Sequence, residues 1–263
     1  MRRTVVAVRS QPWFADMRLG LMQPYFFPYP GHFALIANTD SWVVFDTSQY
    51  TPKRWMNRNR VLRDDVGWIW LTMAVQTGHN RDASKDVLLH DPARSRTQIL
   101  ARLKHYRRSA PFAMTVIELV ADALEVESDC TLVDLNIRTL AAVCGYLGIR
   151  FEPKRLSRLD LELERPSHPG GWAPTVSAAL GADEYLNPAG GAALFRLSEF
   201  DELGVRPLLC HTAPLRYDTG PYRFEEGLSI LDALMWCPPG QIVDYLSSAT
   251  VSTLDEPAEL RVA

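Results

Sequence analysis

Side chains able to carry out chemistry are concentrated between residues 23 and 60. Asp46 and His32 are the candidates for catalysis, because a carboxylate or an imidazole can take a proton from an ammonium or hydroxyl group. Nearby guanidinium groups suit a pyrophosphate or a carboxylate, and aromatic rings suit a sugar or a base. The candidate substrate-binding residues are Gln23, Tyr25, Tyr29, Gln49, Tyr50, Trp55, Asn57, Arg58, Asn59 and Arg60.

A strand, a helix and a second strand are predicted to position these residues. Residues 18–22 form a short apolar run typical of a buried strand, and the three prolines and the glycine of residues 23–31 cannot continue it. A helical pattern begins at His32, and residues 42–45 predict the second strand. In units of this kind ligands lie beyond the carboxyl ends of parallel strands. We therefore expect one concave pocket to be lined by Gln23, Tyr25, His32, Asp46, Gln49, Asn57 and Arg58.

The rest of the chain predicts an α/β fold with a mostly parallel sheet, flanking helices and a Rossmann-like N-terminal half. The apolar run at 68–75 predicts a central strand. If residues 55–60 are extended, Asn57 and Asn59 share one face, and Arg58 and Arg60 share the other. A second parallel pair is expected over 181–186 and 205–211. We expect one domain over 17–247, with an internal boundary near 151–171 as the alternative. Residues 1–16 are predicted to be a disordered extension, and 248–263 a tail.

The composition is that of an ordinary soluble globular protein, with 47% hydrophobic and 22% charged residues among 263. The net charge of −3 argues against a general nucleic-acid binder but leaves a local basic patch open. Four widely spaced cysteines without a C-x-x-C motif indicate reduced thiols in a cytoplasmic protein. No metal-ligand spacing is evident. No membrane partner is expected, because no apolar run reaches the ~18 residues that a spanning helix needs.

Two adjoining sequence blocks resemble one bacterial protein family. The first reads MQPYFFPYxGxFxLI from Met22, and the second reads DxWvvFDxxQYtxxxWxNRNR from Asp40 to Arg60. Together they resemble the WbqC-like family, found in O-antigen and other biosynthetic clusters. The resemblance implies a glycine or aminoacyl transferase that forms an amide on an amino sugar or another small-molecule amine. Its donor would be an aminoacyl-tRNA, an aminoacyl carrier protein, or a free amino acid with ATP.

A second, looser resemblance concerns the start of the predicted helix. Tyr29-Pro30-Gly31-His32 is similar to the H-x-G-H signature of nucleotidyltransferases and pantothenate synthetases, with Tyr29 in place of the first histidine. It implies a nucleotidyltransferase-like N-terminal half and makes ATP a candidate cofactor. The alternatives to a transferase are an ATP-dependent ligase or nucleotidyltransferase, and a non-catalytic binding protein of a biosynthetic cluster. Ser229 is expected to cap a helix, because it and Asp232 have the spacing of a capping box. Cys144 is expected to be a buried core thiol.

Overall fold

A six-stranded sheet forms the centre of the protein, whose computed structural model describes residues 16–78 and 82–255. The strand order is β5-β2-β1-β6-β7-β8; five strands are parallel, and β8 runs antiparallel to β7. The predicted α/β class with a mostly parallel sheet is thus confirmed. The strands are β1 (Arg18–Met22), β2 (Ser41–Val44), β5 (Pro153–Arg155), β6 (Glu184–Pro188), β7 (Arg206–His211) and β8 (Thr250–Thr253).

The first two strands pair as the sequence predicts. Leu19 to Met22 of β1 lie opposite Ser41 to Val44 of β2 in parallel register, and α1 (Pro30–Ala37) connects them. The strand order reverses at β1, which has β2 on one side and β6 on the other. In open α/β sheets this reversal opens a crevice at the carboxyl ends of the strands, where ligands bind. The crevice expected here lies beside the first turn of α1.

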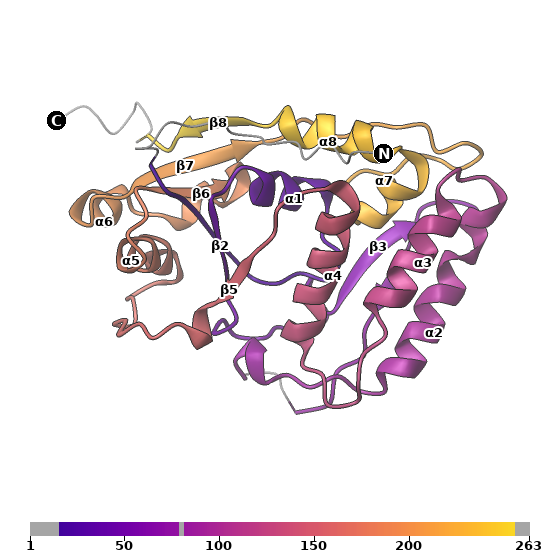
Figure 1. Cartoon of the computed structure of the whole chain (residues 1–263), viewed down its shortest axis with the longest axis horizontal. Coiled ribbons are helices and arrows are strands. Elements are labelled where there is room, and N and C mark those ends of the chain that lie inside the picture. Colours follow the sequence, from indigo (N-terminus) through magenta and orange to yellow (C-terminus); the bar gives the residue numbers. More distant parts are fainter. Residues whose placement is uncertain (1–15, 79–81, 256–263) are drawn as a thin grey trace.

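Helices cover both faces of the sheet (Figure 1). The larger core lies between one face and α1, α4 (Leu132–Leu147), α7 (Ile230–Trp236) and α8 (Pro239–Ser247). The smaller core lies on the other face, beneath α5 (Trp172–Ala179) and α6 (Leu197–Glu202). At the side of the molecule, α2 (Pro92–Leu103) and α3 (Ala113–Ala123) pack together. The short 3-10 helices are η1 (Ser84–Asp86), η2 (Lys104–Arg108), η3 (Leu156–Arg158), η4 (Pro169–Gly171) and η5 (Ala189–Leu194).

A separate antiparallel hairpin, β3 (Arg58–Leu62) and β4 (Trp68–Thr72), corrects the expectation of a central strand over 68–75. Side chains alternate between the two faces of a strand, and in β4 Leu71 faces the core while Trp68 and Trp70 lie on the outer face. The apolar run therefore reflects exposed indoles rather than burial on both faces. Of residues 55–60, only 58–60 are extended, as the start of β3, whereas 55–57 form a turn before it.

The C-terminal end of the chain differs from the predicted division. Residues 250–253, expected to belong to a tail, form β8 along the edge of the sheet. The predicted extension over residues 1–16 lies outside the described residues, apart from Asp16. Strands from both sides of residues 151–171 join in one sheet, with β1 directly paired to β6. No separate sheet therefore begins after this connection in the part of the chain that the structure describes.

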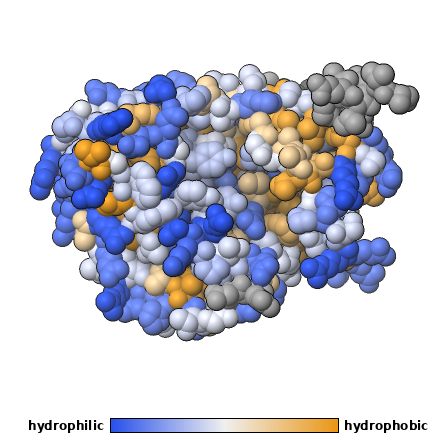
Figure 2. Space-filling model, turned by 180° about the vertical axis from the view of Figure 1, so that it is seen from behind, coloured by the Kyte–Doolittle hydropathy of each residue, from blue (hydrophilic) through white to orange (hydrophobic). Residues whose placement is uncertain are grey.

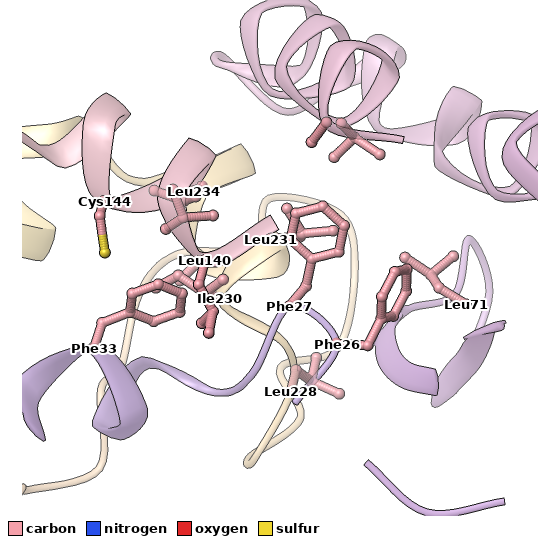
Figure 3. Packing of buried hydrophobic residues seen from close by; sticks show 14 of the residues in the cluster. Phe26, Phe27, Phe33, Leu71, Leu140, Cys144, Leu228, Ile230, Leu231 and Leu234 are labelled. Carbon is pink, nitrogen blue, oxygen red and sulfur yellow. The ribbon is translucent and has the colours of Figure 1, made fainter. Parts of the chain in front are cut away.

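Aromatic residues anchor the connection between β1 and α1. Figure 3 shows Phe26, Phe27 and Phe33 turned into the larger core together with Leu71 and Leu231. All three phenylalanine side chains are buried. Packing on the hairpin and on α7 fixes a loop that has too many prolines to form a regular element.

The smaller core is less completely covered. Phe45, Leu161, Trp172 and Phe195 pack against it but are only partly buried. Seen from behind, apolar side chains gather on the side of the molecule where α5 and α6 lie, whereas most of the remaining face is hydrophilic (Figure 2). The two faces of the sheet thus differ in how closely helices cover them.

Candidate functional site

Three polar side chains hold the loop that follows β1. Asn59 Nδ2 donates to the carbonyl oxygens of Phe26 (3.2 Å) and Phe27 (2.8 Å), and Asn136 Nδ2 donates to that of Pro24 (2.7 Å). Ser229 Oγ donates to the carbonyl of Phe27 (2.6 Å) while accepting from an amide at the start of α7, which confirms its predicted cap. The structure therefore gives Asn59 and Ser229 positioning roles: they fix the loop from which the candidate site is built.

Asp46 lies at the carboxyl end of β2 and is completely buried. Its Oδ1 accepts from the Ser157 amide (2.9 Å), and its Oδ2 accepts from Ser157 Oγ (2.5 Å) and Arg155 Nε (3.0 Å). Arg155 continues the network to Asp134 through Nη1 (2.5 Å). These bonds join β2 to β5 and to α4. They engage the carboxylate that the sequence offers as a general base.

His32 is also completely buried, in the first turn of α1. Its ring packs near Trp42, Tyr25 and Phe33, with centroids 5.3, 5.8 and 6.3 Å away. Neither ring nitrogen has a hydrogen-bond partner among the described residues, and burial lowers the pKa of His32 to about 3. The imidazole is therefore neutral at pH 7 and carries no charge toward a phosphate.

Arginine and tryptophan side chains form an outer layer on the β3–β4 hairpin, which we call the Trp–Arg surface. The Arg58 guanidinium lies 3.9 Å from the ring centre of Trp70, and the Arg60 guanidinium lies 4.9 Å from that of Trp68 and 5.4 Å from that of Trp55. Stacking of this kind holds a guanidinium group without neutralising its charge. The surface consists of Trp55, Arg58, Arg60, Trp68 and Trp70.

The two arginines of this surface keep an uncompensated positive charge. Among the described residues, neither guanidinium has a carboxylate within ion-pair distance, and the Nε atoms of both are buried without a hydrogen-bond partner. Arg60 does donate from Nη2 to the carbonyl of Gly227 (3.0 Å). The predicted anion-binding residues thus lie together and free of acidic partners.

A cavity of about 180 Å³ opens at the first turn of α1, on the other side of Gly227. We call it the tyrosine cavity, because Tyr29, Tyr217 and Tyr245 all line it. Gly31 allows the Tyr29 ring to pack closely against the first turn of α1, since a Cβ at this position would lie 2.5 Å from the ring. Its remaining lining residues are Pro30, Gly31, Thr212, Ala213, Pro214, Leu215, Phe224, Glu225, Gly227 and Leu228.

Glu225 is the acidic group of this cavity. Its side chain is half-buried, and no hydrogen bond or ion pair joins it to another described residue. The adjacent Glu226, by contrast, is exposed and paired with Arg216 (2.5 Å). Glu225 is therefore available to bind an ammonium group or to accept a proton from one.

A buried carboxylate holds one cavity tyrosine in place. Asp232 accepts from the Tyr217 hydroxyl (2.6 Å), from the Leu62 amide (3.1 Å) and from the Tyr106 hydroxyl. Burial raises the pKa of Asp232, and the same burial, followed by the Asp232 charge, raises the pKa of Tyr217. The Tyr217 phenol is thus kept protonated in the cavity wall. Asp232 does not complete the capping box that its spacing from Ser229 suggests.

The predicted binding residues fall into separate groups. Tyr25 donates to Gln23 Oε1 (3.2 Å) near the start of α1. Tyr50 lies beside Arg58. Burial raises the pKa of Tyr50, and the Arg58 charge partly offsets that rise. Asn57 donates to the carbonyl of Met73 (3.1 Å), and Gln49 is exposed. Tyr29 lines the tyrosine cavity and the three residues Trp55, Arg58 and Arg60 form the Trp–Arg surface. The two regions meet at Gly227.

Other chemistry has less support within the described residues. No group of three or more histidine, cysteine, aspartate or glutamate side chains is arranged to hold a metal ion there. Cys144 is buried, and burial raises the pKa of its thiol well above the ordinary value. None of the helices described is both long and apolar enough to cross a bilayer.

The strand order and the cavity beside the first α-helix define a Rossmann-like α/β protein with a candidate site at the carboxyl edge of its sheet. The chain belongs to the WbqC-like protein family, whose model matches residues 23–244. It is also similar to the uncharacterized protein Rv1507c of Mycobacterium tuberculosis, with 29% identity over 243 residues that cover 87% of this chain and 97% of that protein. No solved structure matches the chain.

Proposed function

We propose that the protein is an amide-forming transferase that moves an aminoacyl group, such as glycyl, onto the amine of a sugar or another small molecule. The observation that carries the proposal is the tyrosine cavity, in which an unpaired carboxylate lies among phenol rings at a helix N-terminus. Membership of the WbqC-like family supports it, because the resemblance implies the same reaction class.

The cavity suits an amine as the acceptor. An ammonium group is attracted to the faces of aromatic rings and to a carboxylate. Glu225 would bind the ammonium form, take one proton from it and leave the amine lone pair free to attack. A volume of about 180 Å³ suits a small reacting group, with the rest of each substrate outside.

The first turn of α1 suits the acyl donor. The first N–H groups of a helix have no intrahelical partner, and the helix dipole favours negative charge there. The Gly31 amide and the Tyr29 and Tyr245 hydroxyls would stabilise the oxyanion that develops on the carbonyl oxygen. The new C–N bond forms as the bond from the carbonyl carbon to the leaving group breaks. The proton that the amine loses ends on the leaving group or in solvent.

Asp46 and His32, offered by the sequence as catalytic residues, fit this scheme as positioning residues. The carboxylate of Asp46 is engaged by Arg155 and Ser157, and His32 is buried away from hydrogen-bond partners. A neutral His32 also gives an ATP-dependent ligase less support, because it would add no positive charge beside a phosphate.

A transfer screen by mass spectrometry tests the proposal. The protein is incubated with amino acids supplied as aminoacyl-tRNA, as a thioester of a carrier phosphopantetheine, or free with ATP, each against a panel of amino sugars and simple amines. The expected result is a product with the mass of the amide, formed by the wild type and lost in Gly31→Val, whose side chain would displace the Tyr29 ring that lines the cavity. Gly145→Val, where a Cβ meets nothing within 4 Å, is the control. Absence of an amide product from all three donor forms would overturn the proposal.

A further inference from the structure

The Trp–Arg surface carries more charge and more exposed ring area than a small substrate needs. Trp55 and Trp68 each leave 38% of their surface exposed, a large fraction for indole rings. Both lie beside Trp70, with ring centres 5.8 and 5.1 Å from it. The three indoles therefore form a continuous aromatic area in which Arg58 and Arg60 are embedded.

The surroundings of this surface are basic, although the whole chain has a net charge of −3. Residues 47–63 contain five lysines and arginines and no acidic residue, and of these five Arg63 is paired with Asp65 in the turn between β3 and β4. The end of α2 and η2 adds the exposed side chains of Arg102, Lys104, Arg107 and Arg108, and residues 92–117 also lack an acidic residue. Arg102 donates to the carbonyl of Trp70, so this second basic segment lies against the hairpin.

We propose that the Trp–Arg surface binds the single-stranded end of an RNA. Sites for single strands combine a basic surface that follows the phosphates with aromatic rings on which bases stack. Unpaired bases also stack on guanidinium planes, which Arg58 and Arg60 present beside the indoles. Phosphates would be held by the exposed cations of residues 53–54 and of η2.

The position of the surface connects it with the proposed reaction. Gly227 accepts a hydrogen bond from Arg60 and also lines the tyrosine cavity. An RNA end stacked on the Trp–Arg surface would thus bring its terminal ribose to the cavity. If the proposed function holds, the donor is an aminoacyl ester on the 3′ end of an RNA. The binding step itself does not depend on that function.

Fluorescence anisotropy with a labelled single-stranded RNA tests the binding step without any amine or acyl group. An RNA of about 10 nucleotides covers a typical single-strand site. The variants Trp68→Leu and Arg60→Gln are compared with Trp172→Leu and Arg150→Gln. Trp172 begins α5 and Arg150 lies in the segment after α4, so neither belongs to the hairpin. Far-ultraviolet circular dichroism and the urea midpoint establish that each variant is folded.

The expected result is a dissociation constant that rises about 5- to 100-fold in Trp68→Leu, because stacking on one ring contributes that much per base. Arg60→Gln should also weaken binding, because the guanidinium plane on which a base would stack is lost. The two control variants should bind as the wild type does. Duplex RNA of equal length should bind more weakly, since its bases are not free to stack.

Three results would overturn the inference: no binding by the wild type at low salt, equal binding by Trp68→Leu and the wild type, or equal affinity for duplex RNA. Equal affinity for single-stranded DNA would overturn the assignment to RNA. Because no transfer is measured, these failures leave the proposed amide-forming reaction to its own test. Conversely, a protein that binds the RNA but transfers no acyl group supports the inference and counts against the reaction.

Discussion

Replacing Asp46 by Asn is expected to unfold the protein more easily rather than to remove a catalytic base. The carboxylate is completely buried and accepts three hydrogen bonds from Arg155 and Ser157. In the variant, an NH₂ group replaces one of the two carboxylate oxygens. Both oxygens accept hydrogen bonds in the wild type, so the NH₂ group must face a donor instead of an acceptor. Removing one partner of a buried ion pair costs about 3–5 kcal/mol. Arg155 keeps its bond to Asp134, so we expect the lower end of that range.

Urea unfolding followed by tryptophan fluorescence measures this effect. Asp46→Asn should lower the free energy of unfolding by about 3 kcal/mol. Glu152→Gln is the matched control, because Glu152 pairs with Arg150 on the surface, where both side chains are exposed. The control should unfold almost as the wild type does, since exposed ion pairs contribute little. A loss below about 1 kcal/mol in Asp46→Asn, the level of a surface pair, would refute the positioning role.

Two further predictions concern buried positions. Burial lowers the pKa of His32 from 6.5 to about 3, so between these pH values the unfolded chain binds a proton that the folded chain does not. The free energy of unfolding of the wild type should therefore fall as the pH drops through this window, by up to ~1.4 kcal/mol per pH unit relative to His32→Phe. If the free energies of unfolding of both proteins, measured in urea from pH 7 to pH 4, changed in parallel, this prediction would be wrong. Gly170→Ala should strongly lower the melting temperature, because the new Cβ would lie 1.9 Å from the Leu194 carbonyl oxygen. Gly190→Ala is the control, because a Cβ there meets nothing within 4 Å. Equal melting temperatures for the two variants would show that the close approach at Gly170 is absent.

The parts of the fold that follow from local patterns could be predicted from the sequence. A parallel β1–β2 pair follows from an apolar run, a proline-rich break, a helical pattern and a second apolar run within about 30 residues. The outward face of Arg58 and Arg60 follows from the alternation of side chains in a strand. The same alternation was hidden at 68–75, because tryptophan is counted as apolar even where its ring lies on the surface.

The partners of the predicted residues could not be predicted, because they come from distant segments. Arg155, which engages Asp46, is 109 residues further along the chain. Glu225 and Tyr217 lie in an irregular segment between β7 and α7, where no periodicity marks a role. Their only sequence signal is a cluster of aromatic and acidic residues before the Ser229 cap. Only the folded chain brings this segment to the first turn of α1.

Turnover of Glu225→Gln, with the donor and acceptor that the transfer screen identifies, decides whether amide formation takes place in the tyrosine cavity. Loss of a positioned general base typically lowers the rate ~100- to 10,000-fold. Glu225→Gln should show this loss at saturating substrate, while the neighbouring Glu226→Gln, which changes an exposed pair with Arg216, should keep nearly the wild-type rate. If Glu225→Gln instead turned over at the rate of Glu226→Gln, the tyrosine cavity would not be the site of amide formation.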